Sequence, residues 1–424
     1  MSSYVIEGGT RLMGECTIQG AKNSALPILA ATLVSDGGSI IRNCPVLLDI
    51  DATLNILSYL GCQVLREGNQ VQVSPENASG YEIPERLMRE MRSSVIFLGA
   101  ILARNKKVVL STPGGCDIGL RPIDLHLEAM KKLGAVVREE FGHIECSAPD
   151  GLKGATISLS FPSVGATENI MVAASTAKGT TTVINAAREP EISDLADYLN
   201  SCGAKISGAG QGTIVIEGVK KLSGTVHNVI PDRIVAATYM AATAVTGGEV
   251  KFSNIIPAHI GPEIDFFEET GCNICTASRS LVLKAPERLK SIKLIRTMPY
   301  PGFPTDIGAP VVALLSKAKG TSVVIETIFE NRFRYVGELM RLGAKIRVDG
   351  RMAVVEGVDV LHGVGVQATD LRGGAALMIA ALAAEGITEI SEIRHIERGY
   401  EAPEKILSGL SAKIKRIDGE NGKE

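Results

Sequence analysis

The sequence of 424 residues contains no tryptophan and few aromatic residues of any kind, which make up 4% of the chain. It also lacks an excess of one charge, because 44 basic residues nearly balance 47 acidic ones and the formal net charge is −3. Nucleic-acid-binding proteins need basic surfaces, and single-strand binders also need aromatic rings for stacking. The composition therefore argues against a nucleic-acid-binding protein and against general binding to a membrane surface.

Long hydrophobic runs are absent as well. The strongest apolar runs, residues 25–34 and 375–384, are about half as long as a bilayer-spanning helix requires. The first residues lack the basic start and apolar core of a signal peptide. We therefore expect a cytoplasmic protein whose eight cysteines are reduced. Cys272 and Cys275 have C-x-x-C spacing but no second pair beside them, so neither a zinc site nor a redox pair is predicted.

What the sequence does contain is a sixfold internal repeat of about 70 residues. In each copy a helix ends at a glycine-type cap and a strand follows. The cap positions are Gly61, Gly134, Gly203, Gly271, Gly343 and Ser411. A second pattern, in phase with the first, is a turn that leads into a β-branched strand near residues 38, 107, 179, 248, 320 and 386. Before each turn lies a helix rich in small apolar residues, and its nearly uniform apolar surface predicts that it is buried.

These units of helix, strand, helix and strand account for almost the whole chain and predict an α/β protein of two domains. Three units per domain would give two similar domains, with sheets outside and buried helices within. A single ring of six units, like a propeller, is the alternative. Propeller blades contain only strands, so the predicted buried helices favour two domains.

Basic residues stand near the starts of four predicted buried helices: Lys22, Arg92, Arg233 and Arg372. The helix macrodipole disfavours cations there, so capping alone does not explain them. Cations beside exposed backbone N–H groups form anion sites, which predicts a phosphate-binding cleft. For the last two, a salt bridge to the neighbouring acid (Asp232 or Asp370) is an equally good explanation. The first two have no acid at the same helix start.

The glycine-rich segment 113–126 contains Cys116 between glycines and close to Arg121. A cysteine is most often a buried structural residue. Here, however, paired glycines free the backbone and a nearby cation favours the thiolate, which predicts an exposed and reactive Cys116. Asp306, at the start of another buried helix, could be a partner for the helix dipole or a carboxylate that accepts a hydroxyl proton.

At these residues the sequence resembles the UDP-N-acetylglucosamine 1-carboxyvinyltransferases, a family of enolpyruvyl transferases, from its first strand to its last helix. The motifs that carry the resemblance are Gly20-Ala-Lys-Asn-Ser-Ala-Leu-Pro27, Pro113-Gly-Gly-Cys116, Arg121-Pro-Ile-Asp-Leu-His126, Gly302-Phe-Pro-Thr-Asp306, Phe329-Glu-Asn-Arg-Phe333 and Glu397-Arg-Gly-Tyr400. The resemblance implies two inverse (inside-out) α/β barrels of three repeats each. One would consist of residues 22–229 and the other of residues 1–21 plus 230–424, with the active site in the cleft between them.

The resemblance also implies a reaction: transfer of the enolpyruvyl group of phosphoenolpyruvate to the 3-hydroxyl of UDP-N-acetylglucosamine, the first committed step of peptidoglycan precursor synthesis. It implies no metal and no cofactor. Lys22, Arg121 and Arg398 would hold the phosphate and carboxylate of phosphoenolpyruvate. The residues expected to contact the nucleotide sugar are Asn23, Arg92, Arg121, Pro122, Ile123, Asp124, Leu125, Ser163, Val164, Gly165, Asp306 and Ile328.

Two of these residues would carry the chemistry. By the same resemblance, Asp306 is the base for the sugar 3-hydroxyl, and Cys116 is the proton donor to the enolpyruvyl methylene that also forms a covalent adduct. Whether the essential role of Cys116 is protonation or product release stays open. Fosfomycin, which mimics phosphoenolpyruvate, is expected to alkylate this cysteine.

Two alternatives remain. The related enolpyruvyl transferase that acts on shikimate 3-phosphate shares the fold and the addition–elimination, but the Cys116 loop is not expected in it. A non-enzymatic RNA-binding or RNA-end-processing relative is disfavoured by the acidic net charge and the few aromatic residues. The expected partners are therefore two small-molecule substrates, with no nucleic acid, no membrane and no obligate protein partner.

Overall fold

The computed structural model describes residues 2–111 and 123–419. Within these ranges the chain forms two compact units. The inserted unit consists of residues 20–111 and 123–230, and the terminal unit consists of residues 2–19 and 231–419. Cys116, Arg121 and Pro122 lie outside the described residues.

Each unit contains three four-stranded sheets, and all six sheets share one topology. The first two strands of each sheet are parallel, and the other neighbours are antiparallel. The sheets of the inserted unit are β14 (Val226–Asn228), β3 (Ser39–Arg42), β5 (Gln70–Ser74), β4 (Gln63–Glu67); β6 (Glu82–Ile83), β7 (Lys107–Ser111), β9 (His143–Ser147), β8 (Val136–Glu140); and β10 (Thr156–Ser158), β11 (Thr180–Ile184), β13 (Thr213–Glu217), β12 (Lys205–Ser207).

The sheets of the terminal unit follow the same order of pairing. They are β2 (Met13–Thr17), β15 (Glu249–Ser253), β17 (Ser280–Lys284), β16 (Asn273–Thr276); β18 (Leu294–Arg296), β19 (Thr321–Ile325), β21 (Met352–Glu356), β20 (Lys345–Asp349); and β22 (Gly365–Gln367), β23 (Ile387–Ser391), β1 (Ser3–Glu7), β24 (Lys413–Ile417). Strands therefore follow all six of the turns predicted from the sequence.

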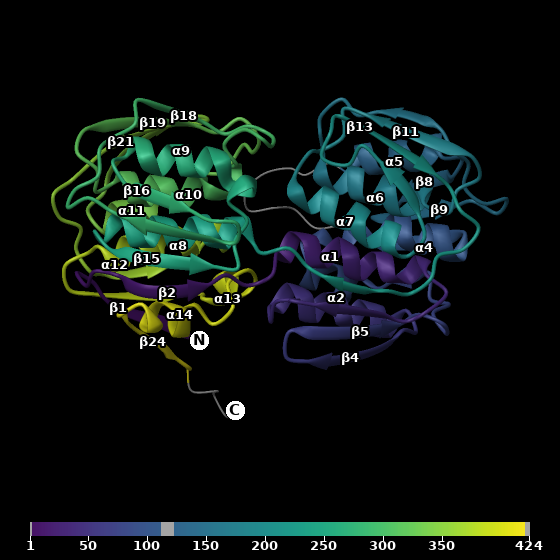
Figure 1. Ribbon diagram of the computed structural model, residues 1–424, viewed down its shortest axis with the longest axis horizontal. Coiled ribbons are helices and arrows are strands. Elements are labelled where there is room, and N and C mark those ends of the chain that lie inside the picture. The colour runs from purple at the N-terminus through teal and green to yellow at the C-terminus, as the bar shows by residue number, and fades with distance from the viewer. Residues whose placement is uncertain (1, 112–122, 420–424) are drawn as a thin grey trace. The chain divides into compact units, whose positions relative to one another are not determined.

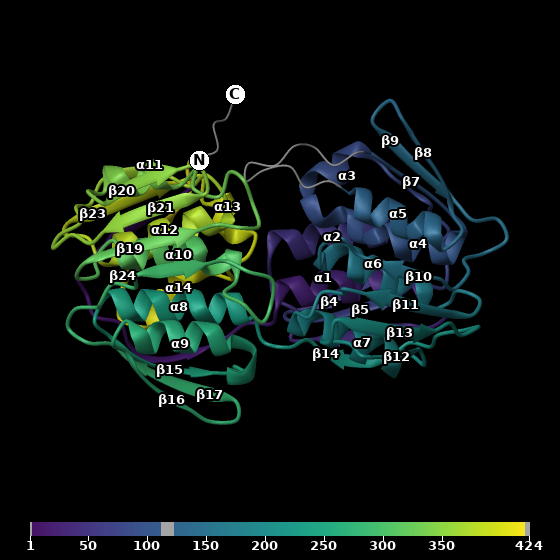
Figure 2. The same cartoon turned by 90° about the horizontal axis from the view of Figure 1, so that it is seen from above.

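Three helices in each unit are buried nearly all the way round. They are α1 (Lys22–Ala31), α4 (Phe97–Asn105) and α6 (Val164–Ala174) in the inserted unit, and α8 (Arg233–Val245), α10 (Thr305–Leu315) and α12 (Leu371–Leu382) in the terminal unit. Helices α8, α10 and α12 pack against one another, and Figure 2 shows them between the sheets of their unit. Because helices fill the interior of each unit, the propeller alternative is wrong.

The other helices have one exposed face. They are α2 (Leu48–Tyr59), α5 (Asp124–Lys132), α7 (Pro190–Ser201), α9 (Gly261–Glu269), α11 (Val336–Arg341) and α14 (Pro403–Gly409). Shorter helical segments are α3 (Glu85–Glu90), α13 (Arg394–Glu397) and the 3₁₀ turns η1 (Thr32–Val34), η2 (Arg92–Ile96) and η3 (Pro257–Ile260). The first and last strands of the chain pair in one sheet, since β1 lies between β23 and β24, and Figure 1 shows β1 close to β24.

The ends of the helices α2, α5, α7, α9, α11 and α14 repeat one hydrogen-bonded motif. After α2, the Gly61 N–H donates to the Ser58 carbonyl and the Cys62 N–H donates to the Leu57 carbonyl. The equivalent pair of bonds follows each of the other five helices. This Schellman arrangement requires a left-handed residue, which glycine adopts without a Cβ penalty. It confirms the repeat predicted at the helix ends, and Ser411 takes the same left-handed conformation with φ of 75°.

In the described part of the chain, no helix is both long enough and apolar enough to cross a membrane. The cysteines described there are free thiols, and no three His, Cys, Asp or Glu side chains come close enough to hold a metal ion. Cys272 is buried, and burial raises the pKa of its thiol to about 11, whereas Cys275 is exposed.

Candidate active site

Lys22 is the first residue of α1, and only 8% of its surface is exposed. Its Nζ lies 2.9 Å from Oδ2 of Asp49, a buried acid in the first turn of α2. Taking a cation out of water is costly without such a partner. The start of α1 supplies no acid, as the sequence indicated, but α2 supplies one from a distance of 27 residues along the chain. Lys22 is thereby held in one place at the helix N-terminus.

Asn169 of α6 connects three segments that carry predicted binding residues. Its Nδ2 donates to the Val95 carbonyl in η2 at 3.0 Å and to His126 Nδ1 in α5 at 2.9 Å. Its Oδ1 accepts the Gly99 N–H at 2.7 Å. A Cβ at Gly99 would lie 2.4 Å from the Asn169 carbonyl oxygen, so only glycine permits this approach of α4 to α6. The start of α5, η2 and the start of α6 are thus fixed to one another.

His126 is buried beside the start of α6. Burial is the main cause that lowers the pKa of this imidazole to about 4, and the nearby Asp124 opposes the shift. Because Nδ1 accepts a hydrogen bond from Asn169, the ring carries its proton on Nε2. A Cβ at Gly165 would lie 3.0 Å from His126 Cε1, so the absence of a side chain at Gly165 leaves room for the ring.

The remaining predicted residues of the inserted unit lie at the same helix starts. Ser163 caps α6, and its Oγ accepts the Ala166 N–H at 3.3 Å. The others there are Asn23, Ile123, Leu125, Val164 and Gly165, which are half-buried, and Asp124, which is exposed; Arg92 begins η2. The structure therefore places these predicted residues at the N-terminal ends of α1, η2, α5 and α6.

In the terminal unit, Asp306 lies in the first turn of α10 between two guanidinium groups. Its Oδ1 accepts from Arg332 Nη2 and from Arg372 Nε, each at 3.1 Å. Both arginines are buried, while the Asp306 side chain is 33% exposed. The two guanidinium groups therefore orient the Asp306 carboxylate while part of its surface stays open. The sequence left the dipole and proton-acceptor explanations of Asp306 equally open, and it did not pair Asp306 with either arginine.

The salt bridge considered for Asp370 and Arg372 is absent among the described residues. The Asp370 carboxylate instead caps α12, where its Oδ1 accepts the N–H groups of Arg372 and Gly373 at 3.0 Å. The Arg372 side chain turns away from it, to Asp306 and to the Tyr400 hydroxyl at 3.1 Å. This explanation, one of the two left open for Arg372, is wrong because the Asp370 carboxylate is directed to the helix N–H groups and the guanidinium is directed to Asp306. Asp232 caps α8 in the same way, through the N–H groups of Ile234 and Val235.

Arg398 directly follows α13 and is half-buried. Its turn is fixed by Gln19, whose Nε2 donates to the Gly399 carbonyl at 3.2 Å and whose Oε1 accepts the Glu401 N–H at 2.9 Å. Two residues after Arg398, the buried Tyr400 contacts Arg372. Arg398 therefore lies two residues along the chain from a tyrosine that contacts Arg372, the partner of Asp306.

Comparisons with known proteins identify the family. A family model described as EPSP synthase (3-phosphoshikimate 1-carboxyvinyltransferase) matches residues 6–407. A UDP-N-acetylglucosamine 1-carboxyvinyltransferase 2 of Caldanaerobacter subterraneus is 52% identical over 98% of this chain and 100% of its own length. The chain belongs to the EPSP synthase family. Within that family it groups with the UDP-N-acetylglucosamine 1-carboxyvinyltransferases, and the protein of that name from Geobacter metallireducens is 47% identical over 98% of this chain and 100% of its own length.

Solved structures of family members share the mixed α/β fold. The enolpyruvyl transferase NikO from Streptomyces tendae has a TM-score of 0.89 and 25% identity, covering 98% of both chains. The EPSP synthase of Acinetobacter baumannii has a TM-score of 0.75 and 18% identity, covering 99% of this chain and 100% of its own, and shows the fold alone.

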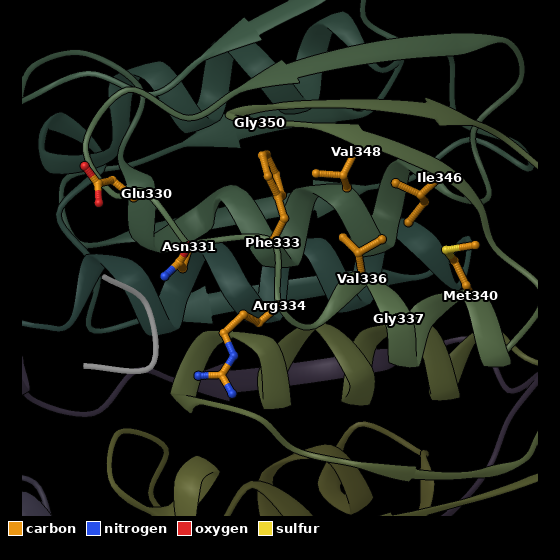
Figure 3. A pocket seen from close by; sticks show the side chains of 10 residues that line it. All are labelled: Glu330, Asn331, Phe333, Arg334, Val336, Gly337, Met340, Ile346, Val348 and Gly350. Atoms are coloured by element: carbon orange, nitrogen blue, oxygen red, sulfur yellow. The ribbon is translucent and has the colours of Figure 1, made fainter. Parts of the chain in front are cut away.

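A separate groove of about 370 Å³ lies on the terminal unit, beside the segment that follows Ile328. In Figure 3 the apolar side chains of Phe333, Val336 and Met340 face those of Ile346 and Val348, with polar side chains at one end. None of the predicted site residues lines this groove.

Proposed function

We propose that the chain transfers the enolpyruvyl group of phosphoenolpyruvate to the 3-hydroxyl of UDP-N-acetylglucosamine and releases phosphate. The observation that carries this proposal is the identity of about half the residues, over nearly the whole chain, to relatives named for this activity. The reaction would be the first committed step of peptidoglycan precursor synthesis, in the cytoplasm. The family's shikimate 3-phosphate enzymes are the second candidate, supported by the description of the matching family model.

The proposal divides the substrates among the predicted residues. Lys22, Arg121 and Arg398 hold the phosphate and carboxylate of phosphoenolpyruvate, since these anions need fixed cations. The nucleotide sugar contacts Asn23, Arg92, Arg121, Pro122, Ile123, Asp124, Leu125, Ser163, Val164, Gly165, Asp306 and Ile328. Because these residues come from both units, the proposal includes two inverse-barrel domains, residues 22–229 and residues 1–21 plus 230–424, each of which contributes binding residues.

The chemistry requires an acid, a base and positive charge in fixed positions. Cys116 protonates the methylene carbon of phosphoenolpyruvate, and positive charge develops at the adjacent carbon. The sugar 3-hydroxyl oxygen attacks that carbon while Asp306 accepts its proton. The methyl group then returns a proton to the Cys116 thiolate as phosphate leaves from the tetrahedral intermediate, and the enol ether double bond re-forms. The ion pairs of Asp306 with Arg332 and Arg372 support its role, because they orient the carboxylate before the substrate binds.

The decisive experiment is inorganic phosphate release from phosphoenolpyruvate, with UDP-N-acetylglucosamine or shikimate 3-phosphate as acceptor. We expect release only with the nucleotide sugar. Asp306→Asn should lower kcat by about 10²-fold or more, as removal of a general base does, and Cys116→Ala should also impair release. The control is Asp370→Asn, which removes a charge at an equivalent helix start but retains a side chain that can cap the helix. Its kcat should stay near that of the wild type.

Release with shikimate 3-phosphate alone would establish the second candidate. Release with neither acceptor, from folded protein shown by its mass to carry no adduct on Cys116, would rule out the transferase. Full activity of Asp306→Asn would leave the reaction standing but remove the proposed base.

A further inference from the structure

Glu326 is a buried acid that none of the motifs in the sequence singles out. It directly follows β19 and is 2% exposed. A carboxylate removed from water must be matched by hydrogen-bond donors. Its two oxygens accept four hydrogen bonds, and the donors come from three segments of the terminal unit.

One oxygen of Glu326 orders the segment that contains Ile328. Oε1 accepts the N–H of Ile328 at 2.7 Å and the N–H of Phe329 at 3.1 Å. It also accepts the Thr297 hydroxyl at 3.0 Å, and Thr297 Oγ1 in turn accepts the Thr327 N–H at 2.9 Å. The backbone from 327 to 329 is therefore tied to the residue that follows β18.

The other oxygen holds the first residue of α10. Oε2 accepts the Thr305 hydroxyl at 2.7 Å, and the Thr305 carbonyl accepts from Arg332 Nη2 at 3.2 Å. The same Arg332 nitrogen donates to Asp306. Thr305 is thus held from both sides immediately before Asp306, and a shift of Thr305 would move the Asp306 carboxylate.

We propose that Glu326 is a positioning residue for the nucleotide sugar, because one buried carboxylate fixes both the Ile328 backbone and, through Thr305, the helix start that carries Asp306. This inference rests on the proposed function. It predicts that a disturbance of Glu326 changes the kinetics for one substrate more than for the other. Glu326 makes no hydrogen bond to Lys22 or Arg398, which are proposed to hold phosphoenolpyruvate, so its loss should affect the nucleotide sugar far more than phosphoenolpyruvate.

The test removes a single hydroxyl. Thr305→Val keeps the branched shape but removes the donor to Oε2. Steady-state phosphate release should show kcat/KM for UDP-N-acetylglucosamine reduced about tenfold, as loss of a hydrogen bond to a charged group implies. The KM for phosphoenolpyruvate should stay within about twofold, since a change below 0.4 kcal/mol is about that size. Thr305→Ser restores the hydroxyl and should recover wild-type kinetics.

The matched control is Ser322→Ala in the same sheet. Ser322 is also buried, and its hydroxyl accepts the Ile292 N–H at 3.0 Å, but it contacts neither Thr305 nor Asp306. Ser322→Ala should lower thermal stability without changing either kinetic constant selectively. If Thr305→Val does not fold, Thr305→Ala removes the same hydroxyl without the second methyl group.

Three outcomes can be told apart. Wild-type protein that releases no phosphate with the nucleotide sugar overturns the proposed function itself. Active wild type with unchanged kinetics in Thr305→Val overturns the positioning role alone. So does an equal rise in KM for both substrates, or a loss that Thr305→Ser does not recover, since either would mean a general effect on the fold.

Discussion

At the scale of single residues, the site depends on charged and polar groups whose partners lie far away in the sequence. Lys22 meets Asp49, and Asp306 meets Arg332 and Arg372. Each of these pairs is at least partly removed from water, where an uncompensated charge is costly. The proposed substrate-binding groups are therefore oriented by protein contacts before any substrate arrives.

His126 provides a prediction at this scale. Its pKa of about 4 lies below the unfolded value of 6.5, so the unfolded state binds more protons between these values and stability falls as the pH drops through this window. At pH 7 the histidine is neutral in both states and imposes no cost. Between pH 7 and pH 4, the unfolding free energy of the wild type should fall by about 3 kcal/mol more than that of His126→Asn.

The variant His126→Asn is suitable because asparagine does not titrate and its Oδ1 can still accept from Asn169. Urea unfolding at a series of pH values, without substrates, measures the difference. Parallel pH profiles for the two proteins would mean that His126 is free to protonate in the folded state.

The residues that sequence reasoning found, and those it missed, differ in one physical respect. Cys116 and the cations at the helix starts were identified because each is unusual for its local segment. The cysteine lies between glycines, and the cations stand where the helix macrodipole disfavours positive charge. Glu326 and Tyr400 gave no such signal, since a glutamate after a strand and a tyrosine in a charged stretch are ordinary. Their importance comes from contacts across 20 to 160 residues, such as Tyr400 with Thr238, which local patterns do not encode.

At the scale of elements, the helix ends were the most predictable feature. A left-handed residue strongly favours glycine, so the backbone requirement is visible in the sequence itself. Ser411 meets the requirement with φ of 75°, at a cost in strain that the five glycines avoid. The buried helices were predictable for a similar reason, because a helix that is apolar on all sides has no face for water.

Ser411→Gly should therefore stabilise the terminal unit by about 0.5–1 kcal/mol, since relief of left-handed strain exceeds the added entropy of the unfolded chain. The shift would be measured by thermal unfolding. The reciprocal change Gly343→Ser, at the equivalent end of α11, should destabilise by a similar amount. If both substitutions lower stability, contacts of the Ser411 side chain outweigh its backbone strain.

At the scale of the whole molecule, the chain leaves and re-enters the terminal unit at neighbouring points. The Ala21 N–H donates to the Ile230 carbonyl at 2.8 Å, and the Asp232 N–H donates to the Gln19 carbonyl at 2.9 Å. The sixfold repeat did not reveal this route, because six equivalent copies leave open which strand completes which sheet. Only the resemblance to the family predicted that the first residues would join the last repeats.

Because the two ends of the inserted unit are hydrogen-bonded to each other, residues 20–230 should fold when produced alone. The fragment should unfold cooperatively and give dispersed amide resonances, but it should release no phosphate. A fragment of equal length, residues 60–270, cuts through sheets of both units and should not fold. A disordered 20–230 fragment would show that its core requires the rest of the chain.

The place of β1 between β23 and β24 has a consequence for the order of events during synthesis. Tyr4 pairs with Ile390 and Arg416, which the ribosome adds 386 and 412 residues later. The inserted unit has all its strands once residue 230 has emerged, whereas β1 must wait, unpaired, until translation is nearly complete. A newly made chain therefore exposes the edges of its first strand for most of its synthesis, which is when a chaperone that shields such edges would matter most.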